Sequence, residues 1–419
     1  MSNNWTAIIL AAGVGTRMKS SLPKVLHQVC GRPMLAYVLD LAKGLGIKNI
    51  LVVTGHKREL LKDLLTRYKA KEVYQDKRLG TADAIKRCQP ALRGFSGNVL
   101  VLYGDQPLLK KETLQKLIQR HTETKAQATI LSAYPQDPFG YGRIIRDNFS
   151  RITAIVEEKD ASAREKEVGE INTGIICFKK DSLFKTIPKI KSDNTKKEYY
   201  LTDAIKIMAR EGALIESVSI SQDVQQAQGI NSRIDLAQAL KAMRLRILAK
   251  FMLEGVTVID PDATYIEEGV RIGRDTVIYP FTFIEKDVII GNFCQIGPFC
   301  HLRPETVIED RVTVGNFTEI TRSRLGRDSF MKHFSYLGDT VAGKAVNIGC
   351  GTVVANFDGR NKNKTVIEDQ AFIGSDTVLR APVRIGKKAV TGAGSVVTKD
   401  VAAGTVVAGV PARILKKDD

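Results

Sequence analysis

Hydrophobic residues in the first half of the chain occur in short runs separated by amphipathic stretches. The runs at 7–10 (AIIL), 50–53 (ILVV) and 99–102 (VLVL) contain no polar residue, which is typical of strands buried on both faces. Strands of this kind that alternate with amphipathic segments predict a mostly parallel sheet covered by helices. We therefore expect residues 1–229 to form one Rossmann-like α/β domain.

A connecting helix is predicted over residues 230–255. Ser232 is a suitable N-cap residue, and Gly255 is a suitable residue to end the helix. Between them, apolar residues recur at helical spacing: Leu236, Leu240, Met243, Ile247 and Phe251.

After Gly255 the apolar period changes to six residues. The long aliphatic positions are Ile266, Ile272, Ile278, Ile284, Ile290, Ile296, Leu302, Ile308, Val314 and Ile320. Four residues after each of the first nine, a second column holds small or β-branched residues: Val270, Thr276, Thr282, Val288, Cys294, Cys300, Thr306, Val312 and Thr318. A six-residue period is typical of a hexapeptide parallel β-helix, in which each repeat forms one short strand. We expect residues 256–419 to form a left-handed parallel β-helix, with the aliphatic column in its core and the small residues where its turns are tight.

The register is interrupted before it resumes at Ile348 and Val354, and again before Ile367. The second interruption, 356–364 (NFDGRNKNK), is expected to leave the solenoid as a surface loop, where function is often located. The flat faces of the uninterrupted coils also favour self-association.

Composition narrows the possible functions. The formal net charge of +17 would suit a polyanion, but Lys and Arg are spread along all 419 residues and no nucleic-acid-binding motif is present. We therefore expect phosphorylated small substrates and no nucleic acid. No apolar stretch has the length of a membrane span and no signal-peptide pattern is found, so a cytoplasmic location is expected. The six cysteines form no CxxC pair and are predicted to be buried thiols.

Glycines directly after the first predicted strand indicate a binding site for phosphate. Gly13 and Gly15 would let backbone N–H groups approach phosphate oxygens, and Arg17 and Lys24 add positive charge. A GxG turn after a strand can also be only a tight turn. The sequence is not GxxxxGK[ST], which disfavours a P-loop hydrolase.

A carboxylate, Asp105, follows the strand at 99–102. The carboxyl end of a strand is the usual ligand crevice of an open α/β sheet, and an Asp there can hold Mg²⁺ against phosphates. Taken alone, Asp105 is equally well interpreted as an ordinary turn residue.

Together these motifs resemble the sugar-1-phosphate nucleotidyltransferases. Within that group the chain is most similar to the bifunctional N-acetylglucosamine-1-phosphate uridylyltransferase / glucosamine-1-phosphate acetyltransferases, over almost its full length. The segments that carry the resemblance are 10–27 (LAAGVGTRMKSSLPKVLH), Gln75, 79–81 (LGT), 103–105 (YGD), 141–143 (YGR), 157–160 (EEKD), 170–174 (EINTG), 198–203 (EYYLTD) and 229–231 (GIN).

The resemblance implies that the first half joins UTP to N-acetylglucosamine-1-phosphate and releases pyrophosphate, with Arg17 and Lys24 as catalytic residues. Asp105 and Asn231 would hold the magnesium ion. The residues implied for nucleotide binding are Leu10, Ala11, Ala12, Gly13, Gly15, Lys24, Gln75, Gly80 and Thr81, and those for the sugar phosphate are Tyr103, Gly104, Gly142, Glu157 and Asn172. One departure is Asp83, where many relatives have His.

The second half could serve only to assemble subunits, but the segment 332–339 (KHFSYLGD) favours catalysis. It lies where the strict repeat breaks, and a neutral imidazole can accept the proton of an attacking amine. The segment resembles the catalytic stretch of the acetyltransferase half, which transfers acetyl from acetyl-CoA to glucosamine-1-phosphate. His333 is therefore the candidate general base, whereas His301 is interpreted as structural.

The resemblance also implies the binding residues of this second site. Glucosamine-1-phosphate would contact Arg303, Tyr336, Asn347 and Lys362, and Asn356 also matches a substrate-binding position. Acetyl-CoA would contact Asn356, Phe357, Ser375 and Ala393 in a groove between subunits of a homotrimer. The product of the two reactions, UDP-N-acetylglucosamine, would supply cell-envelope precursors.

The acetyltransferase half departs from the family pattern in three ways. Thr321 stands where a phosphate-binding Lys is usual, and Arg322 or Arg324 are the candidate substitutes. The solenoid is shorter than is typical, and its end at 407–413 (VAGVPAR) resembles hexapeptide acyltransferases in general. Three functions therefore stay open: a bifunctional enzyme, a nucleotidyltransferase with an assembly module, and an inactive sugar-nucleotide-binding protein.

Overall fold

The computed structural model describes residues 4–220 and 223–415, and the predicted domain ends at 1–3 and 416–419 lie outside the described residues. The chain divides into two compact units, Met1–Leu240 and Lys241–Asp419. The division falls within helix α8 (Arg233–Leu253).

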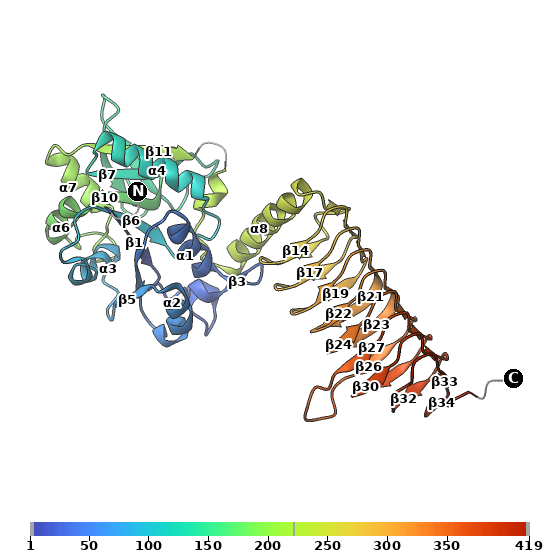
Figure 1. The fold of residues 1–419 in the computed structure, drawn as a ribbon. Helices are drawn as coiled ribbons and strands as arrows, with labels where there is room; N and C mark the ends of the chain where they lie inside the picture. The colour runs from blue at the N-terminus through green and yellow to red at the C-terminus, as the bar shows by residue number, and fades with distance from the viewer. Residues whose placement is uncertain (1–3, 221–222, 416–419) are drawn as a thin grey trace. The chain divides into compact units, whose positions relative to one another are not determined.

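The first unit contains a nine-stranded sheet (Figure 1). Its main path runs β11-β7-β10-β6-β1-β4-β5, and β8 and β9 pair beside β10. These strands are β1 (Trp5–Leu10), β4 (Asn49–Thr54), β5 (Lys71–Tyr74), β6 (Asn98–Tyr103), β7 (Ala128–Ala133), β8 (Gly142–Arg146), β9 (Ile152–Val156), β10 (Ile171–Lys179) and β11 (Ile215–Ile220). β1 pairs in parallel with both β4 and β6. The predicted parallel sheet is therefore present, although β10 runs antiparallel between β6 and β7.

Alternate residues of the apolar runs pack on opposite faces of this sheet, as strand geometry requires. Ala7 and Ile9 belong to one buried cluster, whereas Ile8 belongs to the other. Both clusters include helix residues, and this explains why β1, β4 and β6 read as continuous apolar runs. The helices are α1 (Met34–Gly44), α2 (Lys62–Tyr68), α3 (Thr81–Arg87), α4 (Lys111–Thr124), α5 (Ala163–Lys166), α6 (Lys180–Thr186) and α7 (Asp203–Arg210).

The start of α8 is capped as its sequence predicts. The Ser232 hydroxyl accepts a hydrogen bond from the Asp235 N–H at 3.2 Å. In return, the Asp235 carboxylate accepts from the N–H groups of Ser232 and Asn231 at 2.8 and 2.9 Å. This cap fixes the backbone that carries Asn231, a predicted metal ligand.

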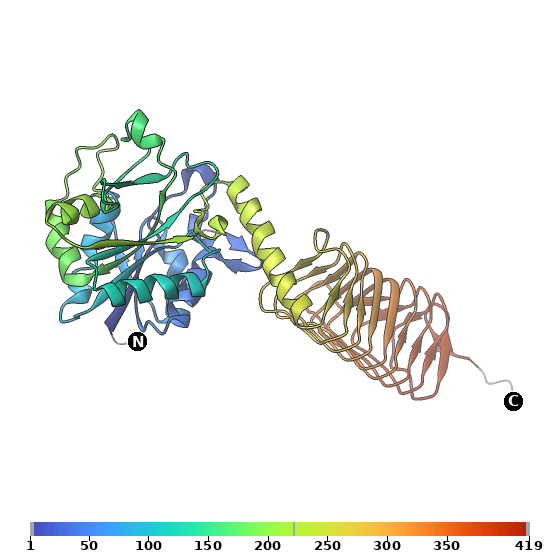
Figure 2. The same cartoon turned by 90° about the horizontal axis from the view of Figure 1, so that it is seen from above.

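The second unit is a triangular β-helix with three strands in each coil. In the first coils each strand pairs in parallel with the strand three places later, so β12 pairs with β15, β13 with β16 and β14 with β17. Figure 2 shows the coils stacked as successive rungs. The strands are β12 (Thr257–Val258), β13 (Tyr265–Ile266), β14 (Arg271–Ile272), β15 (Val277–Ile278), β16 (Phe283–Ile284), β17 (Ile289–Ile290), β18 (Gln295–Ile296), β19 (Cys300–Leu302), β20 (Val307–Ile308), β21 (Thr313–Thr321), β22 (Arg324–Leu325), β23 (Phe330–Gly338), β24 (Thr340–Ala342), β25 (Asn347–Ile348), β26 (Val353–Ala355), β27 (Thr365–Ile367), β28 (Phe372–Ile373), β29 (Val378–Arg380), β30 (Val383–Ile385), β31 (Val390–Thr391), β32 (Val396–Val397), β33 (Val406–Ala408) and β34 (Arg413–Ile414).

Both predicted columns lie in the interior of the β-helix. Ile278, Ile284 and Ile296 have no exposed surface, and neither have Thr276 and Thr282 in the second column. Burying one such aliphatic side chain stabilises a fold by about 1.5–3 kcal/mol. Because every coil repeats this contribution, the six-residue pattern specifies the fold over the whole length of the solenoid.

The strict six-residue period breaks around His333, as predicted, but the coils of the β-helix continue through this segment. Paired residues are 18 apart in early coils, as in Gln295 with Thr313, but 17 apart in Thr313 with Phe330. Each of these coils is therefore one residue shorter, and Leu325, Met331 and Leu337 continue the buried column. Because one residue is missing from each of these coils, a search for apolar residues at every sixth position does not find the column here.

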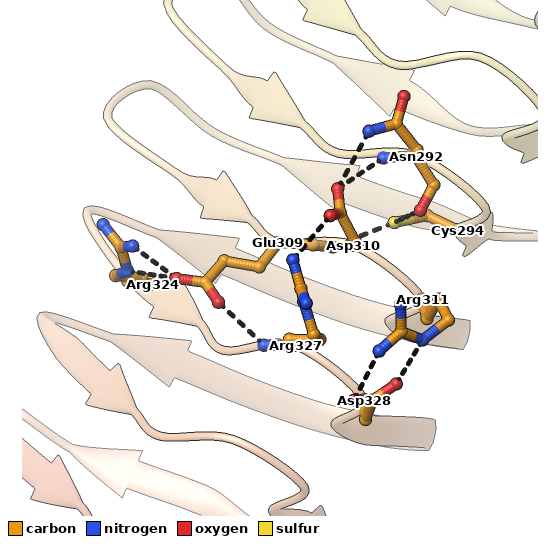
Figure 3. A network of polar contacts seen from close by, with 8 residues as sticks. All are labelled: Asn292, Cys294, Glu309, Asp310, Arg311, Arg324, Arg327 and Asp328. Carbon is orange, nitrogen blue, oxygen red and sulfur yellow. Dashed lines mark hydrogen bonds and ion pairs between the residues drawn. The ribbon is translucent and has the colours of Figure 1, made fainter.

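Surface ion pairs also link successive coils (Figure 3). Arg311 pairs with Asp328 on the next coil at 2.6 Å, and Arg327 pairs with Asp310 at 3.0 Å. Arg324 Nε donates to the Glu309 carboxylate at 2.8 Å. Exposed pairs of this kind contribute roughly 0–1 kcal/mol each, so the buried columns dominate the stability.

The predicted loop at 356–364 leaves the coils and is closed by a bridge between Phe357 and Lys362. The insertion separates the paired residues Thr340 and Thr365 by more than one coil length. The prediction of buried thiols holds for five cysteines but is wrong for Cys350, which lies exposed at a corner of a coil. Among the described residues, no helix is long and apolar enough to cross a membrane.

Candidate active sites

A cleft of about 820 Å³ opens at the carboxyl end of the parallel strands of the first unit. The predicted residues that line it are Leu10, Ala11, Ala12, Gly13, Arg17, Lys24, Gln75, Gly80, Thr81, Tyr103, Asp105, Gly142, Glu157, Asn172 and Asn231. Gly15 and Gly104 are not in this lining. A Cβ on Gly15 would come within 2.7 Å of Lys24 Cβ, so Gly15 instead lets the glycine loop and Lys24 approach closely.

Three side chains converge inside the cleft although they are far apart in the sequence. Lys24 Nζ donates a hydrogen bond to the Asp105 carboxylate and another, of 3.1 Å, to Asn231 Oδ1. Backbone bonds hold the loops together, because Gly104 N donates to Leu10 O at 3.0 Å and Ile230 N donates to Asp105 O at 3.0 Å. The exposed fraction of Asp105 is 9%, so its charge acts in a mostly enclosed place.

The donor set around Lys24 fits a hard divalent cation. Asp105 and Asn231 aim oxygen atoms at one positively charged group, and oxygens are the ligands that Mg²⁺ prefers. Mg²⁺ commonly uses one or two protein oxygens together with phosphates of the substrate. Among the described residues there is no cluster of three or more His, Cys, Asp or Glu that could hold a metal ion.

One end of the cleft is formed by the loop before α3. Gly80 has φ of 115°, and a Cβ there would lie 2.4 Å from Tyr199 O. The hydroxyl of Thr81 accepts from Leu201 N at 2.9 Å, which ties this loop to the 198–203 segment. Gln75, which is buried, donates to Gly80 O at 3.1 Å.

The other end of the cleft carries polar groups suited to a sugar. Glu157 accepts from the Thr202 hydroxyl at 3.0 Å, and burial raises the pKa of the Glu157 carboxyl. Asn172 Oδ1 accepts from Gly174 N at 3.0 Å. The Tyr103 ring packs against Gly174, because a Cβ on Gly174 would lie 2.6 Å from a ring carbon of Tyr103. Burial also raises the pKa of the Tyr103 hydroxyl.

Sequence reasoning missed several residues of the cleft. The missed lining residues with polar or aromatic side chains are Arg78, Gln106, Phe139, Tyr141, Thr173, Lys196, Glu198, Gln228 and Asp235. Tyr141 and Glu198 belong to segments already singled out, and Arg78 is next to the LGT segment. A search of the residues flanking each motif would have found them.

In the second unit, His333 lies exposed on β23 beside Asn316 of β21. The distance from His333 Nδ1 to Asn316 Oδ1 is 3.2 Å. An amide oxygen only accepts, so a proton on Nδ1 can be donated to Asn316, and Nε2 is the ring nitrogen that points away from this contact. The neighbouring His301 instead contacts Glu285 at 2.7 Å and the Phe283 ring edge-on.

Ser375 and Ala393 lie on the same corner of the β-helix as His333. Backbone bonds connect this corner from coil to coil, because Gly351 N donates to Phe334 O and Gly394 N donates to Ser375 O, both at 2.8 Å. Asp376 N donates to Cys350 O between them at 2.6 Å. Ser375 and Ala393 are both exposed, so the structure leaves them open to a ligand along this corner.

The predicted phosphate-binding residue Arg303 is paired with Glu319 at 3.0 Å. Thr321, at the position of the usual Lys, is buried and neutral, so it adds no charge to this region. Arg322 lies beside it and pairs with Asp339 at 2.7 Å. Asp339 also accepts from Asn356 Nδ2 at 2.5 Å, and the Arg322 contact lowers the pKa of the Asp339 carboxyl.

The remaining predicted residues of this site are more dispersed. Lys362 and Phe357 are exposed on the 356–364 loop, whereas Asn347 is half-buried on β25 and Tyr336 half-buried on β23. Of the two candidate substitutes for the missing Lys, Arg324 forms an ion pair with Glu309, one of the surface ion pairs between coils in Figure 3. Arg322 is adjacent to Thr321 and shares Asp339 with Asn356, itself a predicted site residue, so Arg322 is the better candidate.

Two protein-family models match this chain. Residues 7–168 match a MobA-like NTP transferase domain. Residues 287–322 and 364–399 match the bacterial transferase hexapeptide model of six repeats. The two matches lie in different units.

Curated relatives match both halves together. A protein of Carboxydothermus hydrogenoformans named "Bifunctional protein GlmU" is 43% identical over 427 residues, which cover 94% of this chain and 95% of that protein. Its namesake from Pelotomaculum thermopropionicum is 46% identical over 410 residues, with 90% and 89% covered. Among solved structures, UDP-glucose pyrophosphorylase complexed with UDP-glucose has a TM-score of 0.48 and 17% identity, over 59% of this chain and 100% of that one.

Proposed function

The chain belongs to the family of bifunctional GlmU proteins, and we propose which of its residues carry the two reactions of UDP-N-acetylglucosamine synthesis. It is a uridylyltransferase and an acetyltransferase, with the nucleotidyltransferase domain and the hexapeptide repeats as its two catalytic parts. The β-helix forms N-acetylglucosamine-1-phosphate, which the first unit then joins to UTP. Because both reactions use a nucleotide or coenzyme A as substrate, the proposed location is the cytoplasm.

The convergence of Lys24, Asp105 and Asn231 carries the assignment of the first site. In this reaction a phosphate oxygen of the sugar phosphate attacks the α-phosphorus of UTP, a new P–O bond forms and pyrophosphate leaves. Such a reaction needs position and charge neutralisation more than a strong base. Lys24 and Arg17 would hold the triphosphate, while Glu157 and Asn172 would orient the sugar by hydrogen bonds.

Asp105 and Asn231 would hold Mg²⁺ in this site. The ion would neutralise charge that develops on the phosphates. Lys24 contacts the same two oxygens, so its ammonium keeps them together and is then available to the phosphates of the bound nucleotide.

His333 would act as the general base of acetyl transfer. The amine of glucosamine-1-phosphate attacks the thioester carbonyl of acetyl-CoA, a C–N bond forms and the C–S bond breaks. The amine proton goes to His333 Nε2, the ring nitrogen that does not contact Asn316. Arg303 and Arg322 would bind the sugar phosphate, and Ser375 and Ala393 would contact acetyl-CoA.

A homotrimer would complete this second site. Four phenylalanines, Phe281, Phe299, Phe317 and Phe334, form an exposed column on the corner that carries His333, with exposed fractions of 57%, 46%, 57% and 67%. The first three rings stack at centroid distances of 4.8 and 5.1 Å. Exposed apolar surface of this kind favours a subunit contact, and a partner at this corner would shield His333 from water.

Paired assays test both assignments on one preparation. We expect thiol release from acetyl-CoA with glucosamine-1-phosphate, and its loss in His333→Ala. We also expect pyrophosphate release from UTP with N-acetylglucosamine-1-phosphate. A His333→Ala protein that still releases thiol at the wild-type rate would remove the proposed base. Sedimentation of Phe317→Asp tests the assembly, because a charge in the column should yield monomers, and an unchanged trimer would contradict the proposed contact.

A further inference from the structure

The amide of Gln75 is held in one orientation by two acceptors at the edge of the cleft. Its Nε2 donates one hydrogen to Gly80 O at 3.1 Å and the other to Asp83 Oδ2 at 2.8 Å. A primary amide has two N–H donors and one oxygen. Both donors are used, so the Gln75 oxygen is the atom that remains for a ligand in the cleft.

Asp83 is itself held by a short chain of ion pairs. Arg87 Nε donates to the same Asp83 oxygen at 3.1 Å, and Arg87 Nη2 pairs with Asp76 at 2.9 Å. The Asp83 side chain has an exposed fraction of 14%, although it does not itself line the cleft. Its carboxylate is therefore fixed behind Gln75, where only an acceptor can satisfy the amide nitrogen.

We propose that Asp83 is a positioning residue that sets the base preference of the nucleotidyltransferase site. The inference rests on the proposed function and takes Gln75, which the family resemblance implies for nucleotide binding and which lines the cleft, to face the base of the nucleotide. A flipped amide would place its oxygen against the Asp83 carboxylate and the Gly80 carbonyl, which are both acceptors. Asp83 thus keeps an acceptor oxygen directed at the base.

An acceptor oxygen distinguishes pyrimidines by the atom at N3. The N3 of uracil and thymine carries a hydrogen that can be donated, whereas the N3 of cytosine is an acceptor and would repel the Gln75 oxygen. The fixed amide therefore favours UTP over CTP, but it does not distinguish uracil from thymine. Without Asp83 the amide can rotate and offer its N–H groups, so CTP should gain relative to UTP.

The test compares Asp83→Ala with the wild-type enzyme in pyrophosphate release from UTP and from CTP. We expect the KM for UTP to rise roughly tenfold, the size of a lost hydrogen bond to a charged group, with kcat within about twofold. The preference for UTP over CTP should fall by a similar factor. In Asp83→Asn the side-chain oxygen still accepts from Gln75, so the KM should stay close to wild type.

Asp147→Ala is the matched control, because it removes an i,i+4 pair with Arg151 that lies outside the cleft. An unchanged UTP preference in Asp83→Ala, an equal loss in Asp147→Ala, or an equal loss in Asp83→Asn would each overturn the proposal. If wild-type protein releases no pyrophosphate, the proposed function fails by itself. Equilibrium dialysis of UTP and CTP on the same variants then tests Asp83 through binding alone.

Discussion

Asp105→Asn gives the sharpest test of the first site, because it removes one charge and retains the shape and an oxygen of the side chain. Two unit charges 4 Å apart interact by about 4 kcal/mol at an effective dielectric constant of 20, a value suited to a group whose exposed fraction is 9%. About 1.4 kcal/mol corresponds to a tenfold change in rate. We therefore expect kcat/KM for uridylyl transfer to fall roughly 1,000-fold at fixed Mg²⁺.

Acetyl transfer by the same Asp105→Asn preparation is the internal control. Its proposed residues all lie in the second unit, so thiol release should remain within about twofold of wild type. Lys24 keeps an acceptor in Asn231 Oδ1 at 3.1 Å, which limits the loss of stability, and circular dichroism would verify the fold. Uridylyl transfer at more than a tenth of the wild-type rate would show that the Asp105 charge is not what the reaction uses.

Three further predictions concern other parts of the chain. Asn316→Ala should lower acetyl transfer by up to about tenfold, because the ring of His333 loses a hydrogen-bond partner that orients it; an unchanged rate of thiol release would contradict this. Arg322→Ala should raise the KM for glucosamine-1-phosphate, whereas Arg324→Ala, which removes only the Glu309 pair, should not. Burial raises the pKa of Asp203 from 3.8 to about 6, so the folded state holds this proton more tightly and loses stability as pH rises through that range. Asp203→Asn should therefore raise the urea midpoint at pH 7.5 relative to wild type but have little effect at pH 4, and equal effects at both pH values would refute the assigned pKa.

The β-helix could be predicted because its information is local and repeated. A long aliphatic residue recurs at every sixth position, so ten of these residues in register identify the fold without knowledge of any distant contact. The same strict period concealed the coils around His333, where a spacing of 17 replaces 18. A pattern that allows one spacing of five residues in place of six would have included Leu325, Met331 and Leu337 in the aliphatic column.

The geometry of the first site could not be predicted from residue spacing. Lys24 is separated from Asp105 by 81 residues and from Asn231 by 207. Only the order of the strands brings the three loops to one end of the sheet. The sequence motifs identified these residues as candidates, but their common contact depends on how β1 and β6 pair and on the cap of α8.

The burial and the ion pairs of single residues in the β-helix also could not be predicted from the sequence. The strand pattern does not show that Thr321 is buried or that Arg322 is drawn to Asp339. The strand pattern also does not distinguish Cys350, which is exposed, from the other five cysteines, which are buried. In each case the outcome depends on where the residue falls between the corner and the face of a coil, which shifts by one position when a coil is one residue shorter.

One corner of the β-helix carries the exposed phenylalanine column, and the place where the column ends supports the proposed acetyl-CoA site. The four phenylalanines of the exposed column have φ between 34° and 57°, a region that costs a bulky residue about 1 kcal/mol or more. Exposed rings do not offset this cost in a monomer, so a contact in an assembly is the better explanation. Beyond Phe334 the same corner continues with Gly351, Asp376 and Gly394, which have no ring. These residues without rings lie beside Ser375 and Ala393, which are proposed to contact acetyl-CoA. The substitution Gly394→Phe should therefore weaken acetyl-CoA binding and leave uridylyl transfer unchanged.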